Sequence, residues 1–217
     1  MNRCMMIVDG PAGAGKSTLI DRLLQAEHTP FMGAQAIAEL PRPRAYPGEG
    51  LGQLKQTNNI LSALYSDSSS GHIPLIDRGY ASAIIYASIR NNIAYINYRA
   101  ALQNYIALTR ALISQYQTVN GQWPNGDVFD IYEVAICPSE QLLMANREKA
   151  NRPFPYSEDQ AIFRQYGSMI EYSTFYSVSH RVNYHRKAYA VDAVEGLDNV
   201  YKAVYNWGLN IRANFSA

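Results

Sequence analysis

The feature that most constrains this chain is the segment 10–17, which reads GPAGAGKS. It satisfies the pattern G-x-x-x-x-G-K-[ST] in full. The apolar run Cys4–Val8 precedes it and predicts a buried strand, and apolar residues at helical spacing follow it from Ser17 onward. A glycine-rich turn between a strand and a helix is the context in which this pattern binds phosphate. The sequence therefore predicts a phosphate-binding loop at its first strand-to-helix junction.

Each part of this loop has a chemical task. Its glycines let backbone N–H groups turn inward around a phosphate group, where side chains would collide with it. The positive end of the following helix adds a fixed field that favours an anion. Lys16 can reach the β- and γ-phosphates of a nucleoside triphosphate, and the Ser17 hydroxyl can ligate Mg²⁺. We therefore expect ATP and Mg²⁺ as ligands, with the nucleotide-binding residues Gly10, Ala12, Gly13, Ala14, Gly15, Lys16, Ser17 and Thr18.

The rest of the chain alternates between short apolar runs and helical patterns. Further strands are predicted at 73–76, 128–136 and 189–191, with helical spacing between them. This alternation predicts a parallel sheet that is covered by helices on both faces. With 217 residues, the chain is long enough for one α/β domain. Ligands of such sheets bind at the carboxyl ends of the strands, so chemistry is expected in the segments 9–17, 39–44, 77–82 and 192–196.

Charge and composition argue against several other classes of protein. The 19 basic and 18 acidic residues leave a net charge of +1, which disfavours a domain that coats nucleic acid. A basic run at 180–187 is interpreted as a solvated surface rather than a nucleic-acid contact. No apolar run reaches membrane-spanning length and the N-terminus lacks the layout of a signal peptide, so we expect a cytoplasmic protein without a membrane partner. Cys4 and Cys137 fall in predicted strands and are expected to be small buried residues.

Several segments resemble, in sequence order, the thymidylate kinase and deoxynucleoside kinase group of nucleotide kinases. Asp9 and the phosphate loop are similar to the start of thymidylate kinases. Residues 77–82, which read DRGYAS, and Tyr86 are similar to the family's Asp-Arg-Tyr signature, in which a serine and a tyrosine follow at this spacing. Residues 189–193 and 197–200 resemble the family's last strand and closing helix. The likeness spans nearly the whole chain.

The resemblance implies a three-layer α/β P-loop kinase fold, with a five-stranded parallel sheet flanked by helices. It also implies a single nucleotide kinase domain over residues 1–217, with an arginine-bearing lid at residues 146–157. The activity it implies is transfer of the ATP γ-phosphate to a nucleoside or a nucleoside monophosphate. Members of this family often form homodimers, so a homodimer is a further expectation.

The same resemblance gives roles to individual residues. Arg78 is expected to bind the acceptor, the alternative being a structural ion pair with Asp77 or Asp9. Asp77 is expected to help hold Mg²⁺ in the manner of a Walker B acid. Arg147 and Arg152 would close over the transferring phosphate, the alternative being ordinary solvated arginines beside a loop. The predicted catalytic residues are Lys16, Asp9, Glu39, Arg78, Arg147 and Arg152, the predicted substrate-binding residues are Arg42, Arg44, Arg78, Ser82 and Tyr86, and the predicted metal ligands are Ser17 and Asp77.

The acceptor is left open by two features. In deoxynucleoside kinases a glutamate beside a proline takes the proton from the 5′-hydroxyl, and in thymidylate kinases a neighbouring arginine holds the acceptor's phosphate. This chain offers Glu39 for the first task and Arg42 or Arg44 for the second, although one residue separates Glu39 from the proline. Thymidylate kinases also carry a glutamine after the tyrosine that matches Tyr86, where this chain has Ala87, so the nucleobase can be one other than thymine.

Competing hypotheses follow from these residues. Arginines near the acceptor favour a deoxynucleoside monophosphate, because a dianionic group needs to be neutralised. Glu39 favours a nucleoside, because a hydroxyl gains from a positioned base. A third hypothesis is a module that binds nucleotide without transferring phosphate, and a fourth is a kinase for another small alcohol or phosphorylated metabolite. A GTPase switch is disfavoured, because the sequence contains no Asn-Lys-x-Asp motif.

Overall fold

A six-stranded sheet forms the centre of the computed structural model, in the order β2-β3-β1-β4-β6-β5. The structure describes residues 4–33, 71–90, 98–120, 128–151, 157–168, 174–179 and 182–215. The strands of the sheet are β1 (Cys4–Asp9), β2 (Phe31–Gly33), β3 (Ile73–Asp77), β4 (Phe129–Pro138), β5 (Thr174–Ser179) and β6 (Val182–Val191).

Five of these strands run parallel to one another, as the family resemblance implies, and four of the five, all but β2, are predicted by apolar runs in the sequence. β1 lies between β3 and β4, with Ile7 opposite both Ile76 and Glu133. β4 in turn pairs in parallel with β6, which brings Glu133 opposite Arg186. The sixth strand, β5, pairs antiparallel with β6 at the edge of the sheet and is not predicted by the sequence patterns.

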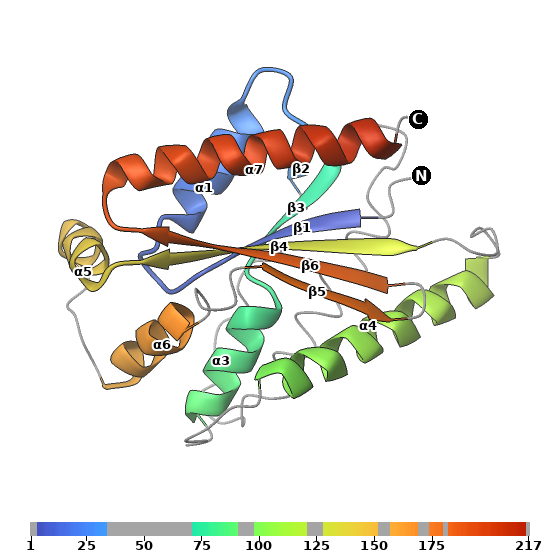
Figure 1. Cartoon of the computed structure of the whole chain (residues 1–217), viewed down its shortest axis with the longest axis horizontal. Coiled ribbons are helices and arrows are strands. Elements are labelled where there is room, and N and C mark those ends of the chain that lie inside the picture. The colour runs from blue at the N-terminus through green and yellow to red at the C-terminus, as the bar shows by residue number, and fades with distance from the viewer. Residues whose placement is uncertain are drawn as a thin grey trace.

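Helices cover both faces of the sheet and give the predicted three layers (Figure 1). One face carries the helices Lys16–Gln25 and Val194–Phe215, and the other carries the helices Tyr80–Arg90, Tyr98–Asn120 and Ser157–Ser168 (Figure 1). A further helix lies near the carboxyl ends of β4 and β6 (Figure 1). The helices are α1 (Lys16–Gln25), α3 (Tyr80–Arg90), α4 (Tyr98–Asn120), α5 (Glu140–Lys149), α6 (Ser157–Ser168) and α7 (Val194–Phe215).

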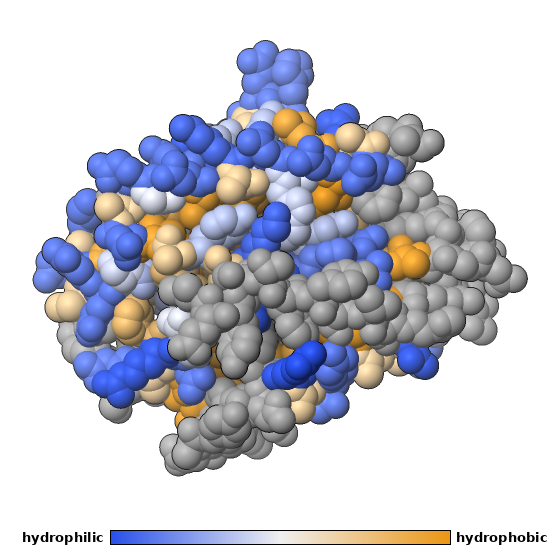
Figure 2. Space-filling view, in the orientation of Figure 1, coloured by the Kyte–Doolittle hydropathy of each residue, from blue (hydrophilic) through white to orange (hydrophobic). Residues whose placement is uncertain are grey.

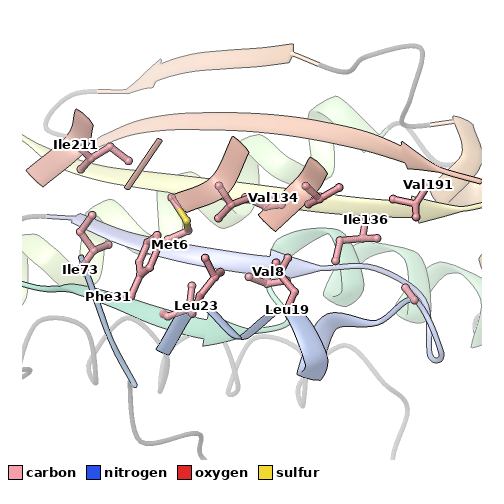
Figure 3. Packing of buried hydrophobic residues seen from close by; sticks show 14 of the residues in the cluster. Met6, Val8, Leu19, Leu23, Phe31, Ile73, Val134, Ile136, Val191 and Ile211 are labelled. Carbon is pink, nitrogen blue, oxygen red and sulfur yellow. The ribbon is translucent and has the colours of Figure 1, made fainter. Parts of the chain in front are cut away.

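Alternation along β1 builds a separate apolar core on each face of the sheet. Met6 and Val8 face α1 and α7, whereas Met5 and Ile7 face α3 and α4. The first core is drawn in Figure 3, where side chains of β1 and β4 meet those of α1. Because β1 is completely buried, both cores fix its position, and with it the position of the loop that follows.

The last predicted strand is longer than its pattern indicated, and this corrects the interpretation of the basic run. The strand β6 begins at Val182 rather than Tyr189, so the segment 182–187 lies inside the sheet. Arg186 is only 2% exposed, which contradicts the prediction of a solvated basic surface at that position. Val182, Tyr184 and Arg186 lie on the same buried face of β6. Because one of these inward positions carries a charge, the sequence does not show the alternation of apolar and polar residues that predicts a strand.

Other predictions fall outside the described residues. Among them is the segment 39–44, in which chemistry is expected. Within the described segments, none of the helices combines the length and apolarity needed to cross a bilayer. In Figure 2 the outward side of α7 carries mostly hydrophilic residues, as expected of a helix that packs on the sheet with one face only.

A pair of helical glycines gives a test of this packing. A Cβ on Gly208 of α7 would overlap with Cζ of Phe31 and lie 2.9 Å from Cγ of Pro30, whereas a Cβ on Gly167 of α6 would meet nothing within 4 Å. Gly208→Ala is therefore expected to lower the free energy of unfolding by about 1–3 kcal/mol. Gly167→Ala is expected to leave it unchanged or raise it by up to about 1 kcal/mol, because alanine favours the helix. Urea unfolding of both variants measures the difference, and equal effects would contradict the packing of α7 on β2.

Candidate active site

The phosphate loop has the backbone form that its glycines make accessible. Gly10 and Gly15 have φ angles of 153° and 85°, in a region that residues with side chains avoid. A Cβ on Gly10 would lie 2.7 Å from the carbonyl oxygen of Ile136, and one on Gly15 would lie 2.8 Å from Cδ1 of Leu197. The loop is thus held closely between β4 and α7 at two positions that admit only glycine.

The lysine of the loop is directed back over it. The Lys16 side chain is 6% exposed, and its Nζ donates hydrogen bonds to the carbonyl oxygens of Gly10 (2.9 Å) and Pro11 (2.8 Å). Ser17 and Thr18 follow in the first turn of α1 and are exposed. The first turn of α1 therefore brings together an ammonium group, the N-terminus of a helix and hydroxyl groups. This combination of groups binds the phosphates of a nucleotide.

The helix α5 packs on the other side of the loop. Arg147 is 7% exposed, and its Nε and Nη2 both donate to the carbonyl oxygen of Ala12 at 3.4 Å. Asn146 donates from Nδ2 to the carbonyl oxygen of Gly13 at 3.0 Å. Residues 146–149 of the predicted lid are therefore part of α5, and Arg147 lies against the loop rather than in solvent. The remainder of the lid at 152–156, including Arg152, lies outside the described residues.

Asp9 joins the phosphate loop to the next part of the site. The carboxylate is fully buried at the end of β1 and accepts a hydrogen bond from the backbone N–H of Gly10 at 2.7 Å. It also accepts bonds from the backbone N–H groups of Gly79 and Ser82, both at 2.9 Å. Two hydroxyl groups complete the set, those of Ser82 (2.5 Å) and Tyr166 (2.7 Å). Elements from three parts of the chain thus depend on one carboxylate.

These hydrogen bonds keep Asp9 charged. Burial on its own would raise the pKa of the carboxyl group, but the bonds from Ser82, Tyr166 and Gly79 favour the ionised form and hold the pKa below its usual 3.8. The Ser82 hydroxyl also contacts the Tyr166 hydroxyl at 2.7 Å and is 7% exposed. Ser82 therefore belongs to this buried cluster, and its predicted contact with substrate stays a prediction.

Arg78 lies at the junction between β3 and α3. Its backbone has a φ of 66°, a left-handed conformation that is costly for a residue with a side chain and that often marks functional sites. Its N–H donates to the carbonyl oxygen of Val8 at 2.9 Å, and its guanidinium Nη1 donates to the hydroxyl of Tyr86 at 3.2 Å. The guanidinium also lies 5.4 Å from the centre of the Tyr86 ring. Two of the residues predicted to bind the acceptor, Arg78 and Tyr86, are therefore in contact.

Asp77, which the sequence predicts to ligate Mg²⁺, ends β3. Its Oδ1 is buried and has no hydrogen-bond partner among the residues that the structure describes. A buried carboxylate oxygen without a donor is costly, and a cation would offset that cost. No group of three or more histidine, cysteine, aspartate or glutamate residues within the described segments could hold a metal ion.

The sequence patterns did not predict a second buried cluster of charged residues, which lies on two neighbouring strands of the sheet, β4 and β6. Glu133 of β4 is fully buried and accepts hydrogen bonds from the backbone N–H of Ala81 (3.1 Å) and from the hydroxyl of Tyr184. Arg186 lies beside it on β6 and favours its ionised form. The signal in the sequence was an acidic residue at a central position of the apolar run of β4, directly before the wholly apolar residues 134–137. The predicted residues Glu39, Arg42, Arg44 and Arg152 lie outside the described residues.

Comparisons with known proteins find only distant likenesses. No protein-family model matches this chain, and no curated protein sequence matches it. Among solved structures, deoxyadenosine kinase from M. mycoides with bound dATP is similar over 95% of this chain and 99% of its own, at 14% identity and a TM-score of 0.48. The same enzyme with the products dCMP and a flexible dCDP covers the same shares at 12% identity and a TM-score of 0.45. These likenesses are too distant to assign a function, which has to come from the residues of the site.

The Asp9 cluster predicts a stability change with a defined pH dependence. Asp9→Asn would place an amide where five donors converge, so it is expected to lower the free energy of unfolding by about 2–4 kcal/mol at pH 7. Because the pKa is lowered in the folded state, the stabilisation is fully present above the unfolded value of 3.8 and is lost as pH falls through the folded value. The gap between wild type and Asp9→Asn should therefore shrink once the solution becomes more acidic than about pH 4.

Urea unfolding across this pH range measures the gap. Asp21→Asn, which changes an exposed aspartate of α1, serves as the matched control and should cost little at any pH. A loss in Asp9→Asn no larger than that of the control would contradict the role of the cluster.

Proposed function

We propose that this chain is an ATP-dependent kinase that transfers the γ-phosphate of ATP to a nucleoside monophosphate. The observation that carries the proposal is the shared carboxylate. Asp9 binds the first N–H of the phosphate loop and two N–H groups beside Arg78, so a triphosphate-binding loop and an acceptor-side arginine are held in one rigid frame.

The loop supplies the donor side of the reaction. The N–H groups of the loop and of the first turn of α1 suit the phosphates of ATP, and Lys16 carries the charge that the β- and γ-phosphates need. The partners of Lys16 include two carbonyl oxygens of the loop. A charged phosphate oxygen would attract its ammonium group more strongly than these neutral oxygens do. Arg147 of α5 contacts the same loop through the carbonyl oxygen of Ala12, and a phosphate bound there would lie near its guanidinium group.

The transfer itself needs charge neutralisation and alignment more than covalent chemistry. An oxygen of the acceptor forms a bond to the γ-phosphorus while the bond from that phosphorus to the bridging oxygen breaks, and ADP leaves with the electron pair. Negative charge spreads over the oxygens of the transferring group during this step. Arg78 and Lys16 are the cations we expect to stabilise it, from the acceptor and the donor side respectively.

The residues present fit a magnesium ion. Ser17 offers an exposed hydroxyl at the start of α1, and Asp77 offers a buried carboxylate oxygen without a donor among the described residues. These two side chains would hold the ion together with phosphate oxygens, and the ion would supply further neutralisation of the triphosphate. Both ligands are oxygen atoms, which Mg²⁺ prefers.

Arg78 favours a phosphorylated acceptor over a free nucleoside. A guanidinium beside a tyrosine, in a partly buried junction, neutralises a dianionic phosphate and gives little to a neutral hydroxyl group. The guanidinium of Arg78 contacts both the ring and the hydroxyl of Tyr86. These contacts restrict its orientation, so we expect the arginine to be preorganised for the acceptor. Arg42 and Arg44, which the resemblance assigns to the same phosphate, are proposed as further contacts.

A transfer assay tests this function. The purified protein with ATP and Mg²⁺ is expected to phosphorylate one or more nucleoside monophosphates in a panel that also contains free nucleosides. Arg78→Ala should lower kcat/KM for the acceptor by about 10- to 100-fold, through loss of charge-assisted hydrogen bonds, and should change the KM of ATP much less. Arg110→Ala, an exposed arginine of α4, is the matched control and should behave as wild type. Transfer to free nucleosides alone would contradict the choice of acceptor, and no transfer at all would contradict the function.

A further inference from the structure

The first turn of α3 cannot be capped by its own sequence. Gly79 precedes the helix, at the position where serine, threonine or aspartate usually accepts hydrogen bonds from the first N–H groups. A Cβ at Gly79 would overlap with Cγ2 of Ile7 and lie 3.2 Å from Oε1 of Glu133. The close approach of this turn to β1 therefore excludes every side chain that could cap the helix.

Two carboxylates from neighbouring strands take over this task. Asp9 of β1 accepts the N–H groups of Gly79 and Ser82, and Glu133 of β4 accepts the N–H group of Ala81, which lies between them. Negative charge at the N-terminus of a helix is also favoured by the helix dipole. The start of α3 is thus fixed by groups that are distant in sequence and completely buried.

We propose that Glu133 is a positioning residue of the acceptor site, which holds the first turn of α3 and through it orients Arg78 toward the acceptor. This inference rests on the proposed function, because it concerns the residue proposed to bind the acceptor. It assigns a role to a buried carboxylate that lies outside the phosphate loop and the Asp77–Tyr86 segment.

The path from Glu133 to Arg78 is short and continuous. Arg78 directly precedes Gly79, and its guanidinium is held by the hydroxyl of Tyr86, which lies on α3 itself. Both the backbone and the side chain of Arg78 therefore move with the first turns of this helix. Weakening the hydrogen bond from the N–H of Ala81 to Glu133 would allow the guanidinium of Arg78 to occupy more positions. Small displacements of such a group lower the rate of catalysis.

The groups around Glu133 make the strength of its hydrogen bond to Ala81 depend on whether Glu133 is protonated. Burial raises the pKa of Glu133 to about 7, and the charge of Asp9 on β1 raises it as well. Arg186 and Tyr184 on β6 and the N–H of Ala81 act in the opposite direction. Tyr80 faces it from α3 as a neutral hydroxyl group, because burial raises the pKa of that tyrosine.

Protonation of Glu133 would weaken its grip on α3. An ionised carboxylate accepts hydrogen bonds about twice as strongly as a neutral group. As pH falls through about 7, the bond to Ala81 therefore loses its charge assistance. Asp9 keeps its charge in this range, because its pKa is lowered, so only the Glu133 half of the cap changes.

Hydrogen–deuterium exchange tests the hold without any need for catalysis. After correction for the chemical exchange rate, the amide of Ala81 in wild type is expected to exchange about five-fold faster at pH 6 than at pH 8, as its charge-assisted bond to Glu133 is lost. Glu133→Gln keeps the shape and an acceptor oxygen but has no charge, so it should exchange at the faster rate at both pH values. Asp130→Asn removes a carboxylate from the same strand but on the opposite face, and should follow wild type.

A second variant moves the transition rather than removing it. Tyr184→Phe deletes the hydroxyl that lowers the pKa of Glu133, so the pH at which protection is lost should rise. Equal exchange of the Ala81 amide at the two pH values in wild type, or a transition in Glu133→Gln like that of wild type, would overturn the inference.

Steady-state kinetics tests whether the hydrogen bond between Glu133 and Ala81 affects the position of Arg78. The acceptor KM of Glu133→Gln divided by that of wild type is expected to be about five at pH 8 and to approach one at pH 6, while the corresponding ratio for ATP stays near one. A ratio that does not change with pH would overturn the positioning role, because a merely structural defect would affect both substrates at every pH. If wild type transfers phosphate to no acceptor, the proposed function fails, and the exchange measurement still decides whether Glu133 holds α3.

Discussion

The structure depends on one buried carboxylate at the end of the central strand. Asp9 accepts five hydrogen bonds, and these come from the phosphate loop, from the start of α3 and from α6. A charged group without water is stable only when its partners are this complete. The need to satisfy Asp9 therefore forces three segments, far apart in sequence, into one fixed arrangement at the carboxyl edge of the sheet.

The same constraint explains why the acceptor side contains unusual backbone. Gly79 lies so close to Ile7 that no side chain fits, and Arg78 just before it adopts a left-handed conformation. A helix that begins at such a turn has no cap of its own, so Asp9 and Glu133 supply it from the strands below. Strain in the turn is offset by hydrogen bonds to charged groups, and the arginine is held in a rigid frame.

Local patterns in the sequence predicted the phosphate loop and four of the parallel strands, whereas the short strand β2 followed only from the family resemblance, as did the pairing of Arg78 with Tyr86 at one site. The loop and the four strands follow from short-range rules, because glycine content, apolar runs and helix periodicity are visible within a few residues. The strand β6 was predicted too short, since Arg186 occupies an inward position that the pattern reserves for apolar residues. Glu133 and Tyr166 could not be placed in the cluster, because their partners are set by strand register and helix packing rather than by neighbours in sequence.

The central claim is that the loop at residues 10–17 cups the phosphates of ATP between inward-facing N–H groups and Lys16. Calorimetric titration of the folded protein with ATP and Mg²⁺ measures this most directly. We predict heat from a single site per chain in wild type, and an affinity at least about ten-fold weaker in Lys16→Ala, through loss of charge-assisted hydrogen bonds. Folded wild type that gives no heat, or a Lys16→Ala variant that binds as tightly as wild type, would contradict the account.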